Sequence, residues 1–484
     1  LVAVLVTLTS CQYNDDEEYY DSVKPAKICL DDPTNCSRCD VFAECTTSST
    51  QVVPRTLNAS VTRYLNITYV GDEVELQPDM FSSLTYLEEL AIHGNLKVTA
   101  LRPGTFAKLP SLTRLLIDKT KIISLPSSLF APKSLLQYLT ITNSKLAEIP
   151  TNIFGDIPNL THADFKFNLI LHKNCSSIGE PFRKLNLLKK LNLANMTVQE
   201  KCMATLGPSF FSPIELGLEI LNLTAANLNG TNPNLFSRFE NLKQLDIGSA
   251  RGFSDCPSSA ADLFWNLPQS LEVLFIRRWR SDVVVTPECI INETSIAGLK
   301  NLTNLKYLDA KWSDMIFGKE LLASTFDGFD SLTRLELGWC RFSQVQEFAF
   351  DNCPSLTHLS LDGNPLGAQP VNLYSNGSTH NLVSLGLKGA GIYSDFTKAF
   401  PAFEVLRSAH VSDLDLRDNY IHRMPIFTSD ESPAATANLR TIKLDKNYLK
   451  DFWWEPDKKF GDFCYLMPNL RKFSVRENRL ENIE

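Results

Sequence analysis

Aromatic and cationic residues recur at matching positions of three segments, LEVLFIRR, LKYLDAKW and LTRLELGW, which begin at Leu271, Leu305 and Leu332. They lie two, four, six or seven positions after the first leucine: Phe275, Arg277, Arg278, Tyr307, Lys311, Trp312, Arg334 and Trp339. Tryptophan, tyrosine and arginine dominate the binding energy of many interfaces, so the pattern predicts a surface that binds a ligand. In the structural alternative, Trp312 and Trp339 stack on each other or under a lengthened loop and only cover irregular segments.

The sequence lacks the spacings that support catalysis. It contains no H-E-x-x-H, no G-x-S-x-G and no phosphate-binding loop. His162 and His358 both lie two positions after a first leucine, but their repeats are seven steps apart in the array. At ~4.8 Å per strand this is roughly 34 Å, too far for both to act on one substrate. We therefore expect no enzyme, no catalytic residue, no cofactor and no metal site.

The three segments are copies of one frame, L-x-x-L-x-L-x-x-N, that repeats every 24 to 34 residues. Fifteen copies are recognisable, and one more at the edge begins at Thr62. They begin at Leu87, Leu112, Leu136, Leu160, Leu188, Leu218, Leu242, Leu271, Leu305, Leu332, Leu356, Leu382, Val411, Leu439 and Leu470. Constant strands with returns of variable length are typical of a solenoid. We expect an α/β leucine-rich repeat solenoid, curved like a horseshoe, with a parallel concave β-sheet and irregular convex returns.

Two other positions of the frame have predictable roles. The asparagine that ends it can satisfy backbone groups of the tight turn after the strand, as at Asn364, Asn419 and Asn447. Phenylalanines further along should close the core where the chain returns: Phe106, Phe130, Phe154 and Phe350.

Four cysteines precede the array, at Cys29, Cys36, Cys39 and Cys45. The end of a solenoid exposes apolar side chains and a strand edge, so we expect residues 29–61 to form a disulfide-linked N-terminal cap. A zinc or redox role for Cys36 and Cys39 is the disfavoured alternative.

The register of the repeats suggests two further disulfides, Cys175 with Cys202 and Cys256 with Cys289, because each pair lies at matching positions of adjacent copies. Cys340 replaces the turn asparagine, and we expect a buried thiol there. Two cysteines have no assignment, Cys353 and Cys464.

The sequence carries signs of the secretory pathway. Residues 1–10, LVAVLVTLTS, resemble the end of a signal peptide, with a bacterial lipobox at Cys11 as the less favoured alternative, and residues 11–28 form an acidic segment expected to be flexible. Eleven N-x-[ST] sequons occur where chance gives about five. They are Asn35, Asn58, Asn66, Asn159, Asn174, Asn195, Asn222, Asn229, Asn292, Asn301 and Asn376. With twelve cysteines, they indicate the extracellular side of the plasma membrane, the endosomal lumen or secretion.

Glycans on three of these sequons would crowd the concave face of the early repeats. Asn66 and Asn222 lie four positions after a first residue of the frame, and Asn195 lies seven after. The surface near residues 275 to 340 would then stay the more open one.

The cap, the stretch VVPRTLNASVTRYLNITY and the irregular array make residues 29–484 resemble the N-terminal portion of a Toll-like receptor ectodomain. In that family the array, here residues 62–484 with about 15–16 repeats, continues to a C-terminal cap, so we expect a truncated chain. The resemblance implies a pattern-recognition receptor that binds a protein, lipid or glycan ligand, dimerises on binding and triggers innate immune signalling. Its membrane attachment would come only through a missing C-terminal segment.

Two alternatives bear on the partner. The acidic tyrosines Tyr13, Tyr19 and Tyr20 resemble the arms of small leucine-rich proteoglycans, which leaves a secreted or matrix binding protein as the alternative function. Nucleic acid is not favoured, because the chain has a net charge of -8 and its arginine cluster at residues 277–280 is small.

Overall fold

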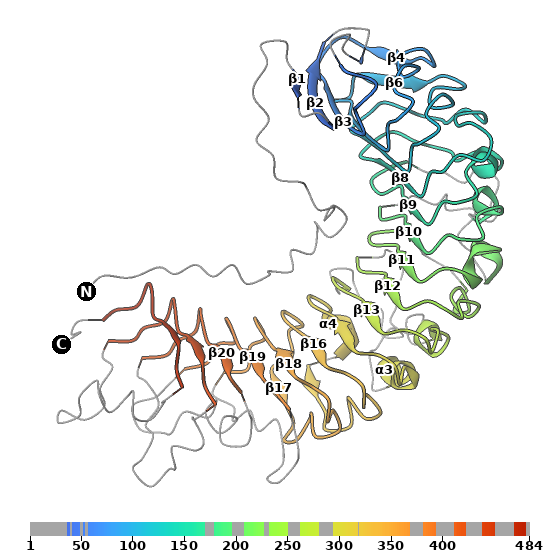
Figure 1. Cartoon of the computed structure of the whole chain (residues 1–484). Helices are drawn as coiled ribbons and strands as arrows, with labels where there is room; N and C mark the ends of the chain where they lie inside the picture. The colour runs from blue at the N-terminus through green and yellow to red at the C-terminus, as the bar shows by residue number, and fades with distance from the viewer. Residues whose placement is uncertain are drawn as a thin grey trace.

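The computed structural model is a curved solenoid whose strands line the inner side of the arc (Figure 1). It describes residues 36–38, 41–48, 52–53, 57–169, 179–195, 208–226, 232–249, 262–279, 294–317, 319–367, 381–393, 411–422, 438–450 and 469–480. Some predicted features lie outside these residues: segments 1–10 and 11–28, Cys29, Cys39, Cys175, Cys202, Cys256, Cys289, Cys464, Asn35, Asn174, Asn229, Asn292 and Asn376.

An 18-stranded sheet forms the concave side. It begins with an antiparallel pair, β1 (Cys36–Arg38) and β2 (Phe42–Thr47). All the strands that follow in this sheet pair in parallel: β3 (Tyr64–Tyr69), β5 (Glu89–His93), β7 (Arg114–Asp118), β8 (Tyr138–Thr142), β9 (His162–Asp164), β10 (Lys190–Asn192), β11 (Ile220–Asn222), β12 (Gln244–Asp246), β13 (Val273–Phe275), β14 (Tyr307–Asp309), β16 (Arg334–Glu336), β18 (His358–Ser360), β19 (Ser384–Gly386), β20 (Asp413–Asp415), β21 (Thr441–Lys443) and β22 (Lys472–Ser474). Each copy of the frame supplies one of these strands, so the predicted fold class is confirmed.

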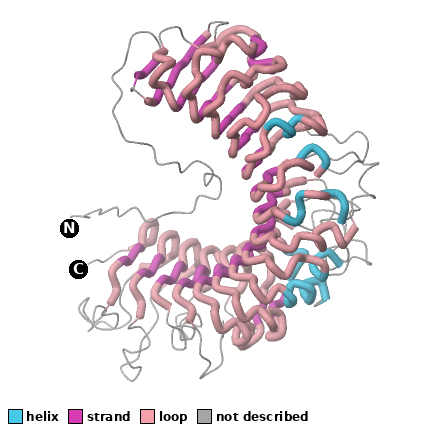
Figure 2. Tube along the Cα trace, turned by 45° about the vertical axis from the view of Figure 1, so that its right-hand side comes forward, coloured by secondary structure: helices cyan, strands magenta, loops and turns pink. Residues whose placement is uncertain are grey.

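The returns contain short and varied elements (Figure 2). Two small parallel pairs join β4 (Val74–Leu76) to β6 (Val98–Leu101) and β15 (Glu320–Leu321) to β17 (Gln344–Val345). The helical turns are η1 (Ile153–Asp156), η2 (Glu180–Phe182), η3 (Pro208–Phe211), η4 (Ile214–Leu216), α3 (Thr294–Ala297), η5 (Gly298–Asn301) and α4 (Asp314–Phe317). None of the described helices is long and apolar enough to span a bilayer.

The core is a stack of leucines closed by aromatic rings. Leu308 and Leu335 pair in register across β14 and β16 and are fully buried, because alternate strand residues point inward. The phenylalanines predicted to close the core are all buried: Phe106, Phe130, Phe154 and Phe350. Phe106 stacks on Phe130 with ring centroids 6.0 Å apart, so the aromatic column continues from one repeat to the next.

The frame asparagines bond the turn of each repeat to the repeat before it. Asn419 Nδ2 donates to the carbonyl of Leu387 in the preceding repeat at 2.8 Å and to that of Leu416 in its own at 3.0 Å. Its Oδ1 accepts from the backbone N–H of Ile392 at 3.0 Å. Asn447 makes the same three bonds one repeat later. The predicted role of this asparagine is confirmed.

Other residue types replace asparagine in the central repeats. The Trp279 indole N–H donates to the carbonyl of Ile247 at 3.0 Å, and the ring is buried against Phe264. Ser313 Oγ donates to the carbonyl of Ile276 at 2.7 Å. The Cys340 thiol donates to the carbonyl of Ala310 at 3.1 Å. A donor at this position is retained while the side chain varies in size.

Replacing Asn419 by alanine should lower the free energy of unfolding by about 2–4 kcal/mol, since a buried carbonyl and a buried N–H lose their partner. Chemical denaturation followed by circular dichroism measures the shift of the midpoint. The control is Asn381→Ala, which removes one exposed hydrogen bond to the carbonyl of Pro354 and should change stability by less than about 0.5 kcal/mol. Equal effects of the two substitutions would contradict the role of the buried asparagine.

Candidate functional site

The predicted binding residues form two groups on neighbouring repeats. We name the first the strand patch, which comprises Phe275, Arg277, Tyr307, Lys311 and Arg334, in or just after β13, β14 and β16. We name the second the turn patch, which comprises Arg278, Trp312 and Trp339. These three have left-handed φ angles of 60°, 63° and 61° and lie beyond the ends of the strands. The seventh position of the frame therefore lies in the turn beyond the strand and not on the strand itself.

Aromatic rings of the strand patch are covered by its arginines. Phe275 meets Tyr307 edge to face with centroids 5.4 Å apart, and the Arg277 guanidinium lies 4.8 Å over the Phe275 ring. The Arg334 guanidinium lies 5.1 Å over Tyr307. Phe275 is consequently only 9% exposed, less than a ligand-facing residue was expected to be.

Carboxylates balance the cations of the strand patch. Lys311 Nζ lies 3.3 Å from Glu336, whose other oxygen pairs with Arg334 at 2.8 Å. Arg277 pairs with Asp246 at 3.1 Å. Asp246 was not among the predicted residues, although it occupies the fourth position of its repeat, where Phe275 lies one repeat later.

Asp309 is a fully buried carboxylate beneath this patch. Its Oδ1 accepts from the Lys311 backbone N–H at 3.1 Å, but its Oδ2 has no hydrogen-bond partner and lies 3.7 Å from Arg277 Nε. Burial raises the pKa of Asp309 to about 6, against the lowering effect of Lys311 and Arg277.

In the turn patch, Trp312 and Trp339 stack with ring centroids 4.8 Å apart and planes 4° from parallel. The structural alternative of mutual stacking is thus observed, yet Trp339 stays 42% exposed. The Trp339 ring packs on the backbone of Gly363, where an added Cβ would lie 2.2 Å from the ring. The stacked pair therefore depends on a glycine in the next repeat.

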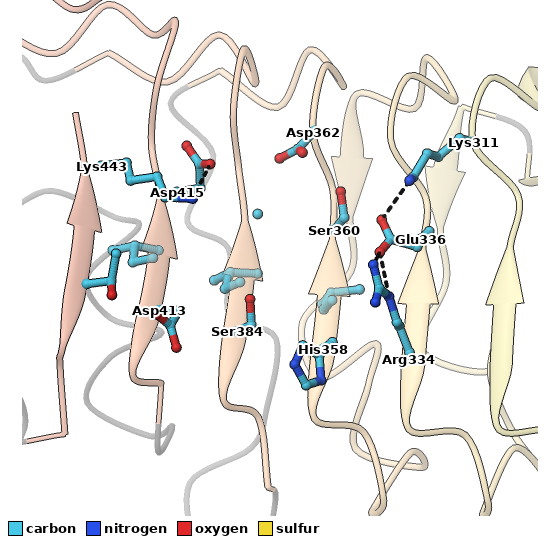
Figure 3. A pocket seen from close by; sticks show the side chains of 15 residues that line it. Lys311, Arg334, Glu336, His358, Ser360, Asp362, Ser384, Asp413, Asp415 and Lys443 are labelled. Atoms are coloured by element: carbon cyan, nitrogen blue, oxygen red, sulfur yellow. Dashed lines mark hydrogen bonds and ion pairs between the residues drawn. The ribbon is translucent and has the colours of Figure 1, made fainter. Parts of the chain in front are cut away.

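A groove next to the strand patch continues along the concave face (Figure 3). It has a volume of about 290 Å³ and runs across β16, β18, β19, β20 and β21. Its polar lining outside the strand patch is Glu336, His358, Ser360, Asp362, Ser384, Asp413, Asp415, Thr441 and Lys443. These residues occupy the second, fourth and sixth positions of later repeats, so the offsets that predicted the strand patch could have found most of them.

The described sequons differ in accessibility. Asn58 and Asn301 are exposed, whereas Asn66, Asn159, Asn195 and Asn222 are partly buried. The Oδ1 of Asn66 is buried without a hydrogen-bond partner, and that of Asn222 accepts from the Thr224 backbone N–H at 2.8 Å. Glycan crowding of the early concave face stays a prediction.

The cysteines whose side chains the structure describes are of two kinds. Cys45 is in a disulfide bond, as predicted for the cap. Cys340 and Cys353 are buried free thiols, and burial raises the pKa of each to about 12. The buried thiol predicted at Cys340 is confirmed, and neither thiol is poised to react as a nucleophile. Among the described residues, no group of three or more His, Cys, Asp or Glu side chains could hold a metal ion.

Comparisons with known proteins agree on this architecture. A family model for leucine-rich repeats matches residues 63–122, and one for BspA-type leucine-rich repeat regions matches residues 291–385. The structure of a TLR13–ssRNA13 complex is similar over 93% of this chain and 68% of that one, with 17% identity and a TM-score of 0.53. A leucine-rich repeat protein of Leptospira interrogans is similar over 90% of this chain and 95% of that one, with 17% identity and a TM-score of 0.50.

The fold is a leucine-rich repeat solenoid, and the two family models identify leucine-rich repeats in residues 63–122 and 291–385. The resembling structures include both a Toll-like receptor and a bacterial protein, so they establish the solenoid fold and leave its biological role to be proposed. Neither matching family model describes an enzyme.

Gly363→Ala should displace the Trp339 ring, because the new methyl group would overlap it. We expect a loss of about 1–3 kcal/mol in the free energy of unfolding and a changed near-ultraviolet circular dichroism signal from the stacked indoles. Gly367→Ala is the matched control: its φ of 64° imposes the same backbone strain, but nothing lies within 4 Å of its added Cβ. Identical spectra and stabilities for both variants would show that Gly363 does not support the stack.

The raised pKa of Asp309 gives a pH-dependent stability. A carboxyl whose pKa is raised from 3.8 to about 6 stabilises the fold fully below about pH 3.8 and loses this contribution as the pH rises through 6. We therefore expect Asp309→Asn to gain stability relative to the native chain between pH 4.5 and 7.5, by up to about 3 kcal/mol, in denaturant titrations.

Asp415→Asn provides a control of opposite sign. Burial raises the pKa of Asp415, but hydrogen bonds and charge from Arg417 and Lys443 lower it overall. Because its pKa is lowered, the ionised Asp415 carboxylate stabilises the fold above pH 3.8, and this stabilisation is lost on acidification. The Asp415→Asn variant should therefore be less stable than the native chain at pH 7.5. Parallel pH profiles for the native chain and both variants would rule out both assignments.

Proposed function

We propose that the chain is the extracellular ligand-recognition domain of a Toll-like pattern-recognition receptor. It binds a protein, lipid or glycan ligand, and ligand-induced dimerisation starts innate immune signalling. In this proposal residues 1–10 are the remnant of a signal peptide, residues 29–61 are the cap, and the array faces the extracellular space or the endosomal lumen.

One observation carries the proposal of recognition. Three neighbouring repeats present aromatic and cationic side chains along one side of the concave sheet, with Trp339 42% exposed at its edge. Such residues bind partners through apolar area and cation–π contacts. When a ligand covers their apolar surface and removes it from water, the burial contributes favourable free energy to binding.

The similar TLR13 structure is a complex with single-stranded RNA, which raises RNA as a ligand class. The charge pattern argues against it here. RNA binding draws on cations that are free to contact phosphates, whereas Lys311, Arg334 and Arg277 each lie within 3.3 Å of a carboxylate. Nucleic acid therefore stays outside the proposed ligand classes.

The second candidate is a secreted or matrix leucine-rich repeat binding protein. The acidic stretch QYNDDEEYYDS before the cap supports it, because proteoglycan arms have similar composition. Both candidates use the same solenoid for binding, so the fold does not separate them.

Sequencing the transcript beyond the codon for Glu484 distinguishes the two candidates. The receptor predicts a cysteine cap, a stretch of about 20 apolar residues and a cytoplasmic α/β domain. A cap followed by a stop codon would contradict the receptor and establish the secreted binder.

A further inference from the structure

Charges alternate along one row of the solenoid, formed by the position just after the first residue of each repeat. In the middle of the array this row contains Lys189, Glu219, Lys243, Glu272 and Lys306 on successive repeats. The Glu219 carboxylate lies 2.9 Å from Lys189 Nζ and 3.6 Å from Lys243 Nζ. Glu272 lies 2.8 Å from Lys306 Nζ. Opposite charges on neighbouring repeats therefore compensate one another here.

The same row carries like charges where β21 and β22 pair, because Arg440 and Arg471 occupy it there. The backbone carbonyl of Arg440 accepts from the backbone N–H of Arg471 at 2.8 Å and from that of Lys472 at 2.9 Å. Three basic residues thus meet at one carbonyl group. The repeat before them supplies Ser412 to this row, which brings no countercharge. Neighbouring like charges repel each other, and an anion that bridges them would relieve this repulsion.

Two further cations extend this cluster along the concave face. We name it the basic patch, which comprises Arg440, Lys443, Arg471, Lys472 and Arg476. All are exposed except Lys443, which is half-buried and lies 3.5 Å from Asp415 (Figure 3). The other four make no ion pair with any described residue. Their charged groups are therefore available to a ligand.

Cations outnumber carboxylates in this part of the concave face. In the repeats of β20, β21 and β22, we compare the first, second, fourth and sixth positions after the first residue. They carry three carboxylates, Asp413, Asp415 and Asp445, and six cations, Arg417 and the five of the basic patch. The whole segment 438–480 contains ten basic and six acidic residues, although the chain has a net charge of -8. The positive charge is therefore not balanced within these repeats.

The neighbouring residue types favour a saccharide over a nucleic acid. The outward positions of β21 and β22 place the hydroxyls of Thr441 and Ser474 beside the cations and carry no aromatic ring. Single-stranded nucleic acids are held by aromatic rings on which their bases stack. Tyr448, in the turn after β21, already stacks on Tyr420 with ring centroids 5.9 Å apart and lies 4.4 Å from the Arg479 guanidinium. Sulfate oxygens, in contrast, need only charge-assisted hydrogen bonds from arginine and lysine.

We propose that the basic patch binds a sulfated polysaccharide of the glycosaminoglycan type, with sulfate groups held between Arg440, Arg471 and Lys472. Charge complementarity carries the assignment, since the cations are exposed, unbalanced and without rings for base stacking. The proposal rests on the proposed recognition function and deepens it, because it names one class of glycan ligand. The basic patch lies on other repeats than the strand patch and the turn patch, so the sites can be tested separately.

Binding of a heparin dodecasaccharide to the full chain, measured by surface plasmon resonance, tests the proposal. Salt of about 0.15 M screens charges more than about 8 Å apart. Arg440→Gln with Arg471→Gln and Lys472→Gln should weaken binding about tenfold or more, because three contacts to sulfate are lost. The dependence of log Kd on log salt concentration should also become less steep, since fewer counterions are released on binding.

The matched control is Lys189→Gln with Lys243→Gln and Lys306→Gln. It changes the net charge equally and at the alternating part of the same row, where each lysine has a glutamate partner. We expect it to change heparin affinity by less than about threefold. Circular dichroism should show the native spectrum for both triple variants, because all six substituted residues are exposed.

Several outcomes would overturn the proposal. They are absence of heparin binding, equal losses in the two triple variants, and unchanged affinity for heparin from which the sulfates have been removed. Tighter binding of oligouridylate, lost in the Arg440, Arg471 and Lys472 variant, would assign the basic patch to nucleic acid. The same result with phosphatidylserine vesicles would assign it to an anionic membrane.

Trp312→Ala with Trp339→Ala, tested on the same heparin probe, separates the basic patch from the turn patch. Heparin binding that survives in this variant and is lost in the Arg440, Arg471 and Lys472 variant supports the basic patch. The reverse pattern supports the turn patch and overturns the basic patch. The transcript beyond Glu484 decides between receptor and secreted binder independently, because either protein would keep the basic patch.

Discussion

The stability of every repeat depends on satisfying the backbone groups exposed where the chain leaves the strand. A buried carbonyl or N–H without a partner costs about 1–3 kcal/mol, and the solenoid creates such groups once per turn. Asn419 and Asn447 meet this need with one carboxamide that bonds its own repeat and its neighbour. Because each bond crosses a repeat boundary, the same contacts that close a turn also hold the stack in register.

This constraint explains the unusual central repeats. Trp279, Ser313 and Cys340 keep a donor at the turn position while their sizes differ widely. The large indole of Trp279 reaches back to the preceding repeat and fills the core against Phe264. The residue just before this donor has a left-handed φ angle, and in two adjacent repeats that residue is Trp312 or Trp339. Because both turns have the same geometry, the two indole rings lie parallel and stack on each other.

The concave face carries both ion-paired groups and carboxylates held only by hydrogen bonds. Around Tyr307 and Glu336, cations pair with carboxylates or cover aromatic rings, which favours selective contacts over attraction of any polyanion. Further along, Asp362 and Asp413 make hydrogen bonds but no ion pair within the described residues, and they lie beside the small residues Ser360, Ser384 and Gly386. Two chemically different surfaces thus lie side by side on one sheet, as expected of a scaffold whose strands vary in sequence while its register is constant.

The sequence by itself determined the solenoid, its strand positions and the role of the frame asparagine, because these follow from a periodic pattern that each repeat shares. The roles of particular exposed residues were decided by tertiary structure. Phe275 occupies an outward position, yet Arg277 and Tyr307 cover it, and only the pairing of adjacent strands brings them together. Likewise, Gly363 makes room for Trp339 from the next repeat, and burial beneath neighbouring side chains raises the pKa of Asp309. The position of a residue within its repeat determines which way its side chain points. Its exposure and its protonation state depend on neighbours in adjacent repeats, 24 to 34 residues away, and the sequence of one repeat does not specify how these neighbours pack.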